Sequence, residues 1–66
     1  MRRLLVIDDE AQIRRLLEIA FGARDWEVFQ AATGFEGLMS VQSSRPDIVL
    51  LDLNLPDMSG LEALKQ

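Results

Sequence analysis

Apolar and polar residues follow one another along this chain in blocks whose period changes from strand-like to helix-like. Residues 4–7 form a continuous apolar run, which is typical of a strand covered on both faces. Over residues 11–22 the apolar positions recur at spacings of three and four, which predicts a helix that ends near Gly22. Asp9, with Gln12 three positions later, is expected to cap its start. The residues expected to face inward on this helix are Ile13, Leu16, Leu17, Ala20 and Phe21.

The next two blocks repeat this change of period. Residues 26–31 predict a second strand, and Glu27 and Gln30 within it favour an edge position. Thr33 and Glu36 have the spacing of a capping box, which predicts the start of a second, short helix. The residues expected to face inward on that helix are Phe35, Leu38 and Val41.

The last part of the chain supplies one more strand and the beginning of a helix. Residues 48–52 predict a third strand that closes on an acid, and residues 54–58 read as a loop. Ser59 and Glu62 form a further capping box, from which a third helix would run to the end of the chain. The order βαβαβα predicts one α/β domain over residues 1–66, with a parallel sheet and right-handed crossovers.

Both continuous apolar strands run directly into carboxylates. Asp8 and Asp9 follow the first of these strands, and Asp52 follows the third strand of the chain. If the two strands are parallel neighbours, the three carboxylates converge at one edge of the sheet, where ligands bind in open α/β sheets. Their mutual repulsion favours a compensating cation, and Mg²⁺ is a hard cation that prefers oxygen ligands. The pattern therefore indicates a Mg²⁺ site suited to phosphoryl transfer, although an Asp after a strand is also a common helix cap.

Composition narrows the possible chemistry. The chain has 66 residues, a net charge of −4, no cysteine and no histidine. A disulfide, a thiolate metal site and a phosphohistidine donor are therefore excluded. The acidic balance disfavours nucleic-acid binding by this segment, and no apolar run approaches the roughly 20 residues of a membrane span. The first apolar run is also too short for a signal peptide, so we expect a cytoplasmic protein.

Two segments together are similar to a known family. The sequence VIDDE at residues 6–10 and the sequence IVLLDLNLPDMSG at residues 48–60 resemble the receiver (CheY-like) domain of two-component response regulators. The resemblance covers the whole chain and implies the N-terminal half of a flavodoxin-like sheet, with strand order 2-1-3. The sequence IRRLL at residues 13–17, with DLNLPD at residues 52–57, further resembles the potassium-transport (KDP operon) group of winged-helix transcriptional regulators.

The resemblance assigns a role to each acidic residue of the predicted site. Asp52 would be the phospho-acceptor, attacking the phosphorus of a phosphohistidine on a sensor histidine kinase. Asp9 would coordinate Mg²⁺ directly and Asp8 would hold it through water, while Asn54 would contribute its backbone carbonyl and Asp52 would complete the metal site. Such a module is a signalling acceptor and not an enzyme. DNA would be bound only by an output domain that this chain lacks.

The chain also departs from the family pattern. The resemblance implies a Ser or Thr after a fourth strand and a Lys after a fifth strand, and neither is present; Lys65 cannot be assumed to replace the latter. The third strand, central in the family, would become a bare apolar edge that invites pairing with another chain. We therefore expect a homodimer joined through Ile48–Leu51, or a swapped assembly that completes the sheet.

Other functions remain open at this stage. The chain could act only as a self-associating scaffold without phosphorylation. It could also be a Mg²⁺-dependent phosphatase of the aspartyl-phosphate type, but that class carries a second acid two residues after the nucleophile, where this chain has Asn54. Nucleotide binding of the Rossmann kind is disfavoured, because the first turn between strand and helix is acidic and lacks glycine.

Overall fold

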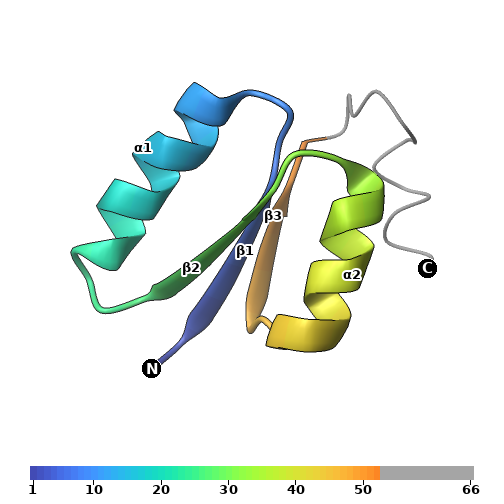
Figure 1. Ribbon diagram of the computed structural model, residues 1–66. Helices are drawn as coiled ribbons and strands as arrows, with labels where there is room; N and C mark the ends of the chain where they lie inside the picture. The colour runs from blue at the N-terminus through green and yellow to red at the C-terminus, as the bar shows by residue number, and fades with distance from the viewer. Residues whose placement is uncertain (53–66) are drawn as a thin grey trace.

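The computed structural model describes residues 1–52, and the elements follow the predicted order (Figure 1). They are β1 (Arg3–Ile7), α1 (Ala11–Gly22), β2 (Glu27–Ala31), α2 (Gly34–Ser44) and β3 (Ile48–Leu51). The third helix, predicted from Ser59 and Glu62, lies outside the described residues. None of the described helices is long and apolar enough to cross a membrane.

The three strands form a parallel sheet in the order β2-β1-β3. Leu5 at the middle of β1 lies opposite Phe29 of β2 and Val49 of β3. The chain therefore moves from β1 to one neighbour through α1, and then passes over β1 to the other side through α2. The predicted α/β class and the 2-1-3 order are confirmed.

The two helices cover opposite faces of this sheet. Val6 and Ile7 are adjacent on β1, so their side chains point to opposite faces. Gly37 of α2 packs against Ile7, whereas Arg14 of α1 bonds to Gln30, which is the register partner of Val6. The arrangement is a doubly wound sheet in which β1 is enclosed between the two helices.

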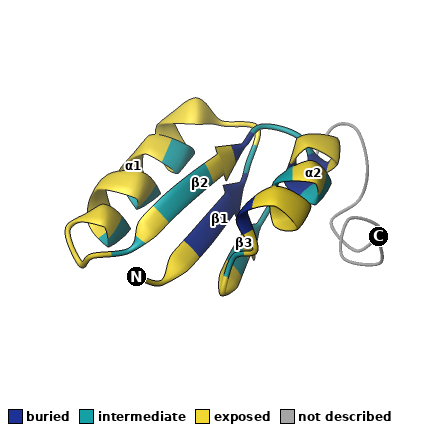
Figure 2. Ribbon diagram, turned by 60° about the horizontal axis from the view of Figure 1, so that its bottom comes forward, coloured by how far each residue is buried: buried dark blue, intermediate teal, exposed yellow. Residues whose placement is uncertain are grey.

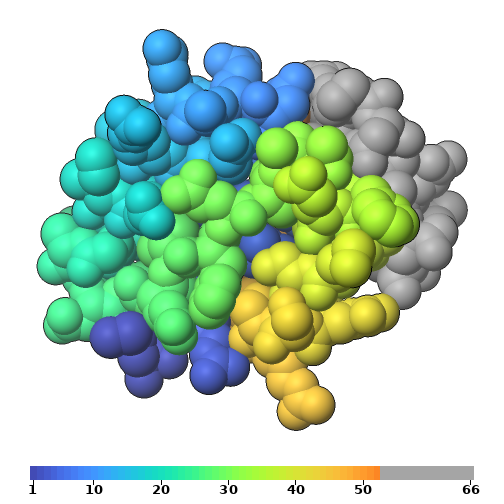
Figure 3. All heavy atoms as spheres, viewed as in Figure 1, coloured from blue at the N-terminus to red at the C-terminus, as the bar shows by residue number. Residues whose placement is uncertain are grey.

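The core is centred on β1, as its unbroken apolar run predicts. Leu4, Leu5 and Val6 are almost completely buried, and Figure 2 shows that β1 holds most of the buried strand residues. In the space-filling view, β1 is largely hidden behind β2 and the two helices (Figure 3). On the α2 side, the buried core residues and their half-buried apolar neighbours are Leu5, Ile7, Ala31, Phe29, Val49 and Leu51.

The inward face predicted for α1 is only partly correct. Leu17 and Phe21 are half-buried against the sheet, but Leu16 is 63% exposed and Ala20 is also exposed. Ile13 is exposed as well. The physical reason is that α1 packs mainly against β2, so one flank of its wide apolar face is not covered. Sequence periodicity identified the apolar face but could not show how much of it the sheet reaches.

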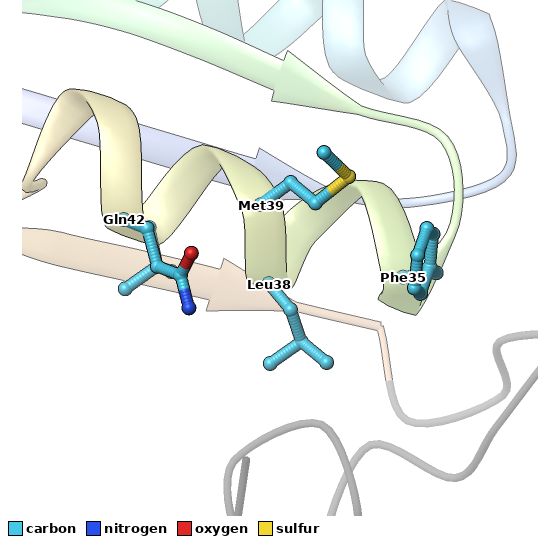
Figure 4. A pocket seen from close by; sticks show the side chains of 5 residues that line it. Phe35, Leu38, Met39 and Gln42 are labelled. Carbon is cyan, nitrogen blue, oxygen red and sulfur yellow. The ribbon is translucent and has the colours of Figure 1, made fainter.

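The inward face predicted for α2 is wrong for Phe35 and Val41, and Leu38 is turned only partly inward. Gly34, Gly37 and Ser44 are the buried residues of this helix, and Phe35 is 61% exposed. Val41 is also exposed and Leu38 is half-buried. Small residues face the sheet because α2 approaches β1 closely, so the larger apolar residues are turned aside. The larger apolar residues of α2 line a cavity of about 270 Å³, and Figure 4 shows the side chains around it.

The N-cap predicted for α2 is confirmed, and the reciprocal bond of Glu36 goes to the residue before the N-cap. Thr33 is the N-cap, and its Oγ1 accepts a hydrogen bond of 3.1 Å from the backbone N–H of Glu36. The Glu36 side chain reaches back to accept from the backbone N–H of Ala32, also at 3.1 Å. These two bonds satisfy backbone donors at the start of the helix.

The capping box predicted for α1 is wrong. The N-cap of α1 is Glu10, which makes no side-chain cap bond, and neither Asp9 nor Gln12 caps the helix. Instead, Asp8 Oδ1 accepts a bond of 2.9 Å from the backbone N–H of Glu10. The side chain that accepts a backbone bond in this turn is therefore that of Asp8, one residue before the predicted Asp9.

The turn from α1 into β2 also differs in detail from the prediction. Helix α1 ends at Gly22 as expected, but the second strand begins at Glu27 and not at Trp26. The backbone N–H of Trp26 donates to the carbonyl of Phe21 at 3.2 Å, and the two rings pack edge to face at 5.7 Å. This local pairing keeps Trp26 in the turn.

Candidate functional site

Backbone hydrogen bonds at the carboxyl edge of the sheet hold the two acidic segments in place. The N–H of Asp8 donates to the carbonyl of Ala31 at 3.0 Å, and the N–H of Asp52 donates to the carbonyl of Ile7 at 2.9 Å. Each acidic residue therefore continues the hydrogen-bonding ladder of its strand by one step. Adjacent strands lie about 4.8 Å apart. The prediction that the first and third strands are parallel neighbours is confirmed, and Asp8 and Asp52 follow their ends at the same edge of the sheet.

Three consecutive carboxylates gather at this edge. One oxygen from each of Asp8, Asp9 and Glu10 lies within 4.8 Å of the other two, with Asp8 half-buried and the other two exposed. We call residues 8–10 the acidic loop. Asp52 is half-buried on the adjacent strand end and is not a member of this carboxylate group. Asn54, whose backbone carbonyl is the remaining predicted metal ligand, lies outside the described residues.

The donor set of the acidic loop fits a hard divalent cation. It consists of carboxylate oxygens, which Mg²⁺ prefers over nitrogen or sulfur, and the chain contains no histidine or cysteine to favour a transition metal. Two of the three carboxylates are exposed, so a cation can reach them while keeping part of its water shell. The sequence prediction found Asp8 and Asp9, whereas Glu10 joins them only in the folded loop.

One residue of α1, Arg14, makes hydrogen bonds to the acidic loop. The side chain of Arg14 donates from Nη1 to the carbonyl of Asp8 at 2.7 Å, and its backbone N–H donates to the carbonyl of Glu10 at 3.2 Å. Its Nε donates to Oε1 of Gln30 on β2 at 3.2 Å. Sequence reasoning assigned no role at the site to Arg14 or Gln30. The one available signal was that Arg14 follows Glu10 by four positions, which is one helical turn.

The cavity on α2 is separate from this site. It is lined by Phe35, Leu38, Met39, Val41 and Gln42. Among residues 1–52, four of these lining side chains are apolar and Gln42 is polar (Figure 4). The acidic residues to which the sequence assigns phosphoryl chemistry lie at the sheet edge.

Comparison with known proteins establishes the family. Residues 4–66 match the response regulator receiver domain, and the chain belongs to this family. It is 44% identical over 64 residues to sporulation initiation phosphotransferase F of Bacillus subtilis, covering 97% of this chain and 52% of that protein. It is 48% identical over 64 residues to the transcriptional regulatory protein KdpE of Mycobacterium tuberculosis, covering 97% of this chain and 28% of that protein.

Solved structures agree with the fold. The response regulator TrrA of Thermotoga maritima, in complex with Mg²⁺-BeF, superposes with a TM-score of 0.90 at 40% identity. The match covers 98% of this chain and 56% of TrrA. TrrA in complex with the histidine kinase ThkA matches with a TM-score of 0.89, at the same identity and coverage. The chain thus spans about half of a receiver structure, which confirms the flavodoxin-like class for the part present.

Proposed function

We propose that this chain is a phosphoacceptor module of a two-component phosphorelay, in which Asp52 takes a phosphoryl group from a sensor histidine kinase in the presence of Mg²⁺. The observation that carries the proposal is the hydrogen bond of 2.9 Å from the N–H of Asp52 to the carbonyl of Ile7. This bond supports the proposal, because it joins Asp52 to the end of the strand that leads into the acidic loop. A nucleophilic carboxylate and a cation-binding loop would then share one edge.

Phosphoryl transfer to Asp52 would depend mainly on the positions and charges of the groups at the site. An oxygen of the Asp52 carboxylate would bond to phosphorus while the bond from phosphorus to the imidazole nitrogen of the kinase breaks. Asp8, Asp9, Asp52 and the backbone carbonyl of Asn54 would hold the cation. Bound Mg²⁺ supplies charge neutralisation between the carboxylates and the incoming phosphoryl oxygens. The chain acts as the acceptor in this scheme, and no enzymatic turnover is assigned to it.

The relatives support the choice of partners. The kinase complex of TrrA supports a sensor histidine kinase as the donor, and its Mg²⁺-BeF complex supports Mg²⁺ as the cofactor. The similarity to KdpE supports a parent protein that regulates transcription. DNA binding by an output domain outside this chain and a cytoplasmic location are part of the same proposal. These assignments extend the family membership and belong to the proposal.

The test is intact-mass analysis after incubation of the chain with acetyl phosphate and Mg²⁺. We expect one added phosphoryl group in the wild type and none in Asp52→Asn. Asp25→Asn is the matched control, because it makes the same change from Asp to Asn but at an exposed position in the turn before β2. Asp25 has a φ of 67°, a conformation that Asn tolerates well, so the control should fold and be phosphorylated like the wild type. Equal phosphorylation of Asp52→Asn would contradict the acceptor assignment.

A second candidate function is self-association without phosphorylation. Among the described residues, β3 pairs with β1 alone, and its Ile48 and Leu50 are 46% and 36% exposed. An apolar strand in this position is suited to pairing with a second copy, which would give a homodimer through Ile48–Leu51. A folded chain that takes up no phosphoryl group but sediments as a dimer would favour this scaffold function over the acceptor function.

A further inference from the structure

We propose that Arg14 is a positioning residue for the acidic loop, holding residues 8–10 in the conformation that binds a divalent cation. The inference rests on the proposed function, because it concerns the Mg²⁺ affinity of that loop. It adds a residue on α1 to a site otherwise formed by strand ends. Its basis is the set of hydrogen bonds made by Arg14, together with the charge of the groups that accept them.

Arg14 contacts the acidic loop at both of its ends. The Nη1 of its guanidinium donates to the carbonyl of Asp8 at 2.7 Å, in a partly buried bond. Its backbone N–H donates to the carbonyl of Glu10 at 3.2 Å. The bond from the N–H of Glu10 to Asp8 Oδ1 adds a third constraint within the same loop. The main-chain bond is the first helical bond of α1, which any residue at this position would make, so the specific contribution of Arg14 is its side-chain bond to the carbonyl of Asp8.

The guanidinium itself is anchored to the sheet. Its Nε donates to Oε1 of Gln30 at 3.2 Å, and Gln30 lies on β2. The planar guanidinium can donate in two directions at once, which the single ammonium group of a lysine does less rigidly. Arg14 therefore connects the loop after β1 to the neighbouring strand β2.

Both side-chain acceptors of Arg14 are uncharged oxygens. Within residues 1–52, the recorded ion pair is between Arg3 and Glu27, and none joins Arg14 to a carboxylate of the acidic loop. Arg14 thus orients the loop backbone without forming an ion pair with the side chains that would hold the cation. As a nearby positive charge, however, it also repels a cation. Positioning and charge therefore predict opposite effects when Arg14 is replaced.

The opposite signs define the experiment. The Mg²⁺ affinity of the 66-residue chain is measured from the amide shifts of Asp9 and Glu10 in an NMR titration with MgCl₂. Removing the outer support of a metal site typically weakens binding by 10–100-fold, so we expect Arg14→Met to bind Mg²⁺ about tenfold more weakly. Arg15→Met is the matched control, because it removes the same charge from the next, exposed position of α1. We expect its affinity to be unchanged or slightly higher.

Two further variants separate positioning from general stability. Arg14→Lys keeps the charge but loses the planar pair of donors, and Gln30→Ala removes the anchor on β2; both should weaken Mg²⁺ binding. Urea unfolding without Mg²⁺ shows whether each variant is folded. Unchanged or tighter Mg²⁺ binding by folded Arg14→Met, Arg14→Lys and Gln30→Ala would overturn the inference. If the folded wild type shows no response to Mg²⁺, the metal assignment of the proposed function fails, and the positioning role fails with it.

Discussion

Gly37 of α2 lies against Ile7 of β1 so closely that the two residues set the distance between helix and sheet. A methyl group placed on the α-carbon of Gly37 would lie 2.4 Å from Cδ1 and 2.9 Å from Cγ1 of Ile7. Ile7 is 4% exposed and belongs to the main core cluster, so its side chain has little room to move. The contact is what allows α2 to cover the central strand.

We predict that Gly37→Ala destabilises the chain, by about 1–2 kcal/mol. Overpacking costs about 1–3 kcal/mol, and the higher helix propensity of alanine offsets up to about 1 kcal/mol of it. Gly22→Ala is the control, since no atom lies within 4 Å of its added methyl group. We expect that control to be neutral or slightly stabilising. Urea unfolding checks both variants, and Ile7→Val combined with Gly37→Ala should recover part of the loss, because it removes the nearest methyl group. Equal stability of the two glycine variants would contradict the close contact.

The N-cap of α2 gives a second prediction. Thr33→Ala removes the acceptor of the 3.1 Å bond from the N–H of Glu36 and should lower the free energy of unfolding by about 1 kcal/mol. Thr33→Ser retains the hydroxyl and should lose much less. Gln12→Ala tests the capping box that the structure does not form, and thermal or urea unfolding should show almost no change. A loss for Gln12→Ala as large as that for Thr33→Ala would restore the original capping prediction for α1.

The acidic loop gives a third prediction, on cation binding. Asp9→Asn should reduce the calorimetric response to Mg²⁺ to the background level, because it removes one charged ligand of a hard cation. Glu10→Gln should weaken binding less, since the family resemblance assigns the direct ligand role to Asp9. Asp25→Asn serves as the charge-matched control at the other end of the sheet and should bind as the wild type does. A full response in Asp9→Asn would remove that residue from the site.

The exposed strand gives a fourth prediction, on oligomeric state. Leu50→Lys places a charge on β3 and should shift the chain toward monomer, because charged residues on an edge strand oppose pairing. Met39→Lys is the control, since Met39 is 59% exposed on α2 and does not belong to the strand. Sedimentation equilibrium measures both. If both variants become equally monomeric, or if neither changes, association does not run through β3.

Several features followed from residue order because their causes are local. The unbroken run Leu4–Ile7, too apolar for a solvated strand, predicted the buried centre of the sheet. Thr33 and Glu36 predicted a helix start because both partners of a capping box lie within one turn. The acidic residues after β1 and β3 predicted a shared edge, since right-handed crossovers leave few alternatives for strand order. The family resemblance then added the roles of Asp8, Asp9 and Asp52.

The features that sequence reasoning missed depend on contacts between distant segments. Phe35 and Leu38 have the spacing of a core-facing stripe, yet Gly37 faces the sheet, because only a residue without a side chain fits against Ile7. Arg14 resembles any solvated helix arginine until the path of the loop brings the carbonyl of Asp8 to 2.7 Å from its Nη1.

By itself, the sequence determined the elements, the parallel order and the acidic edge, because hydrophobic period, capping and strand-end chemistry act over a few neighbouring residues. Only the tertiary structure decided which helix faces are buried and which residue holds the acidic loop. Those outcomes depend on how closely α1 and α2 approach the sheet, and that distance is set by the packing of side chains that lie far apart in the chain.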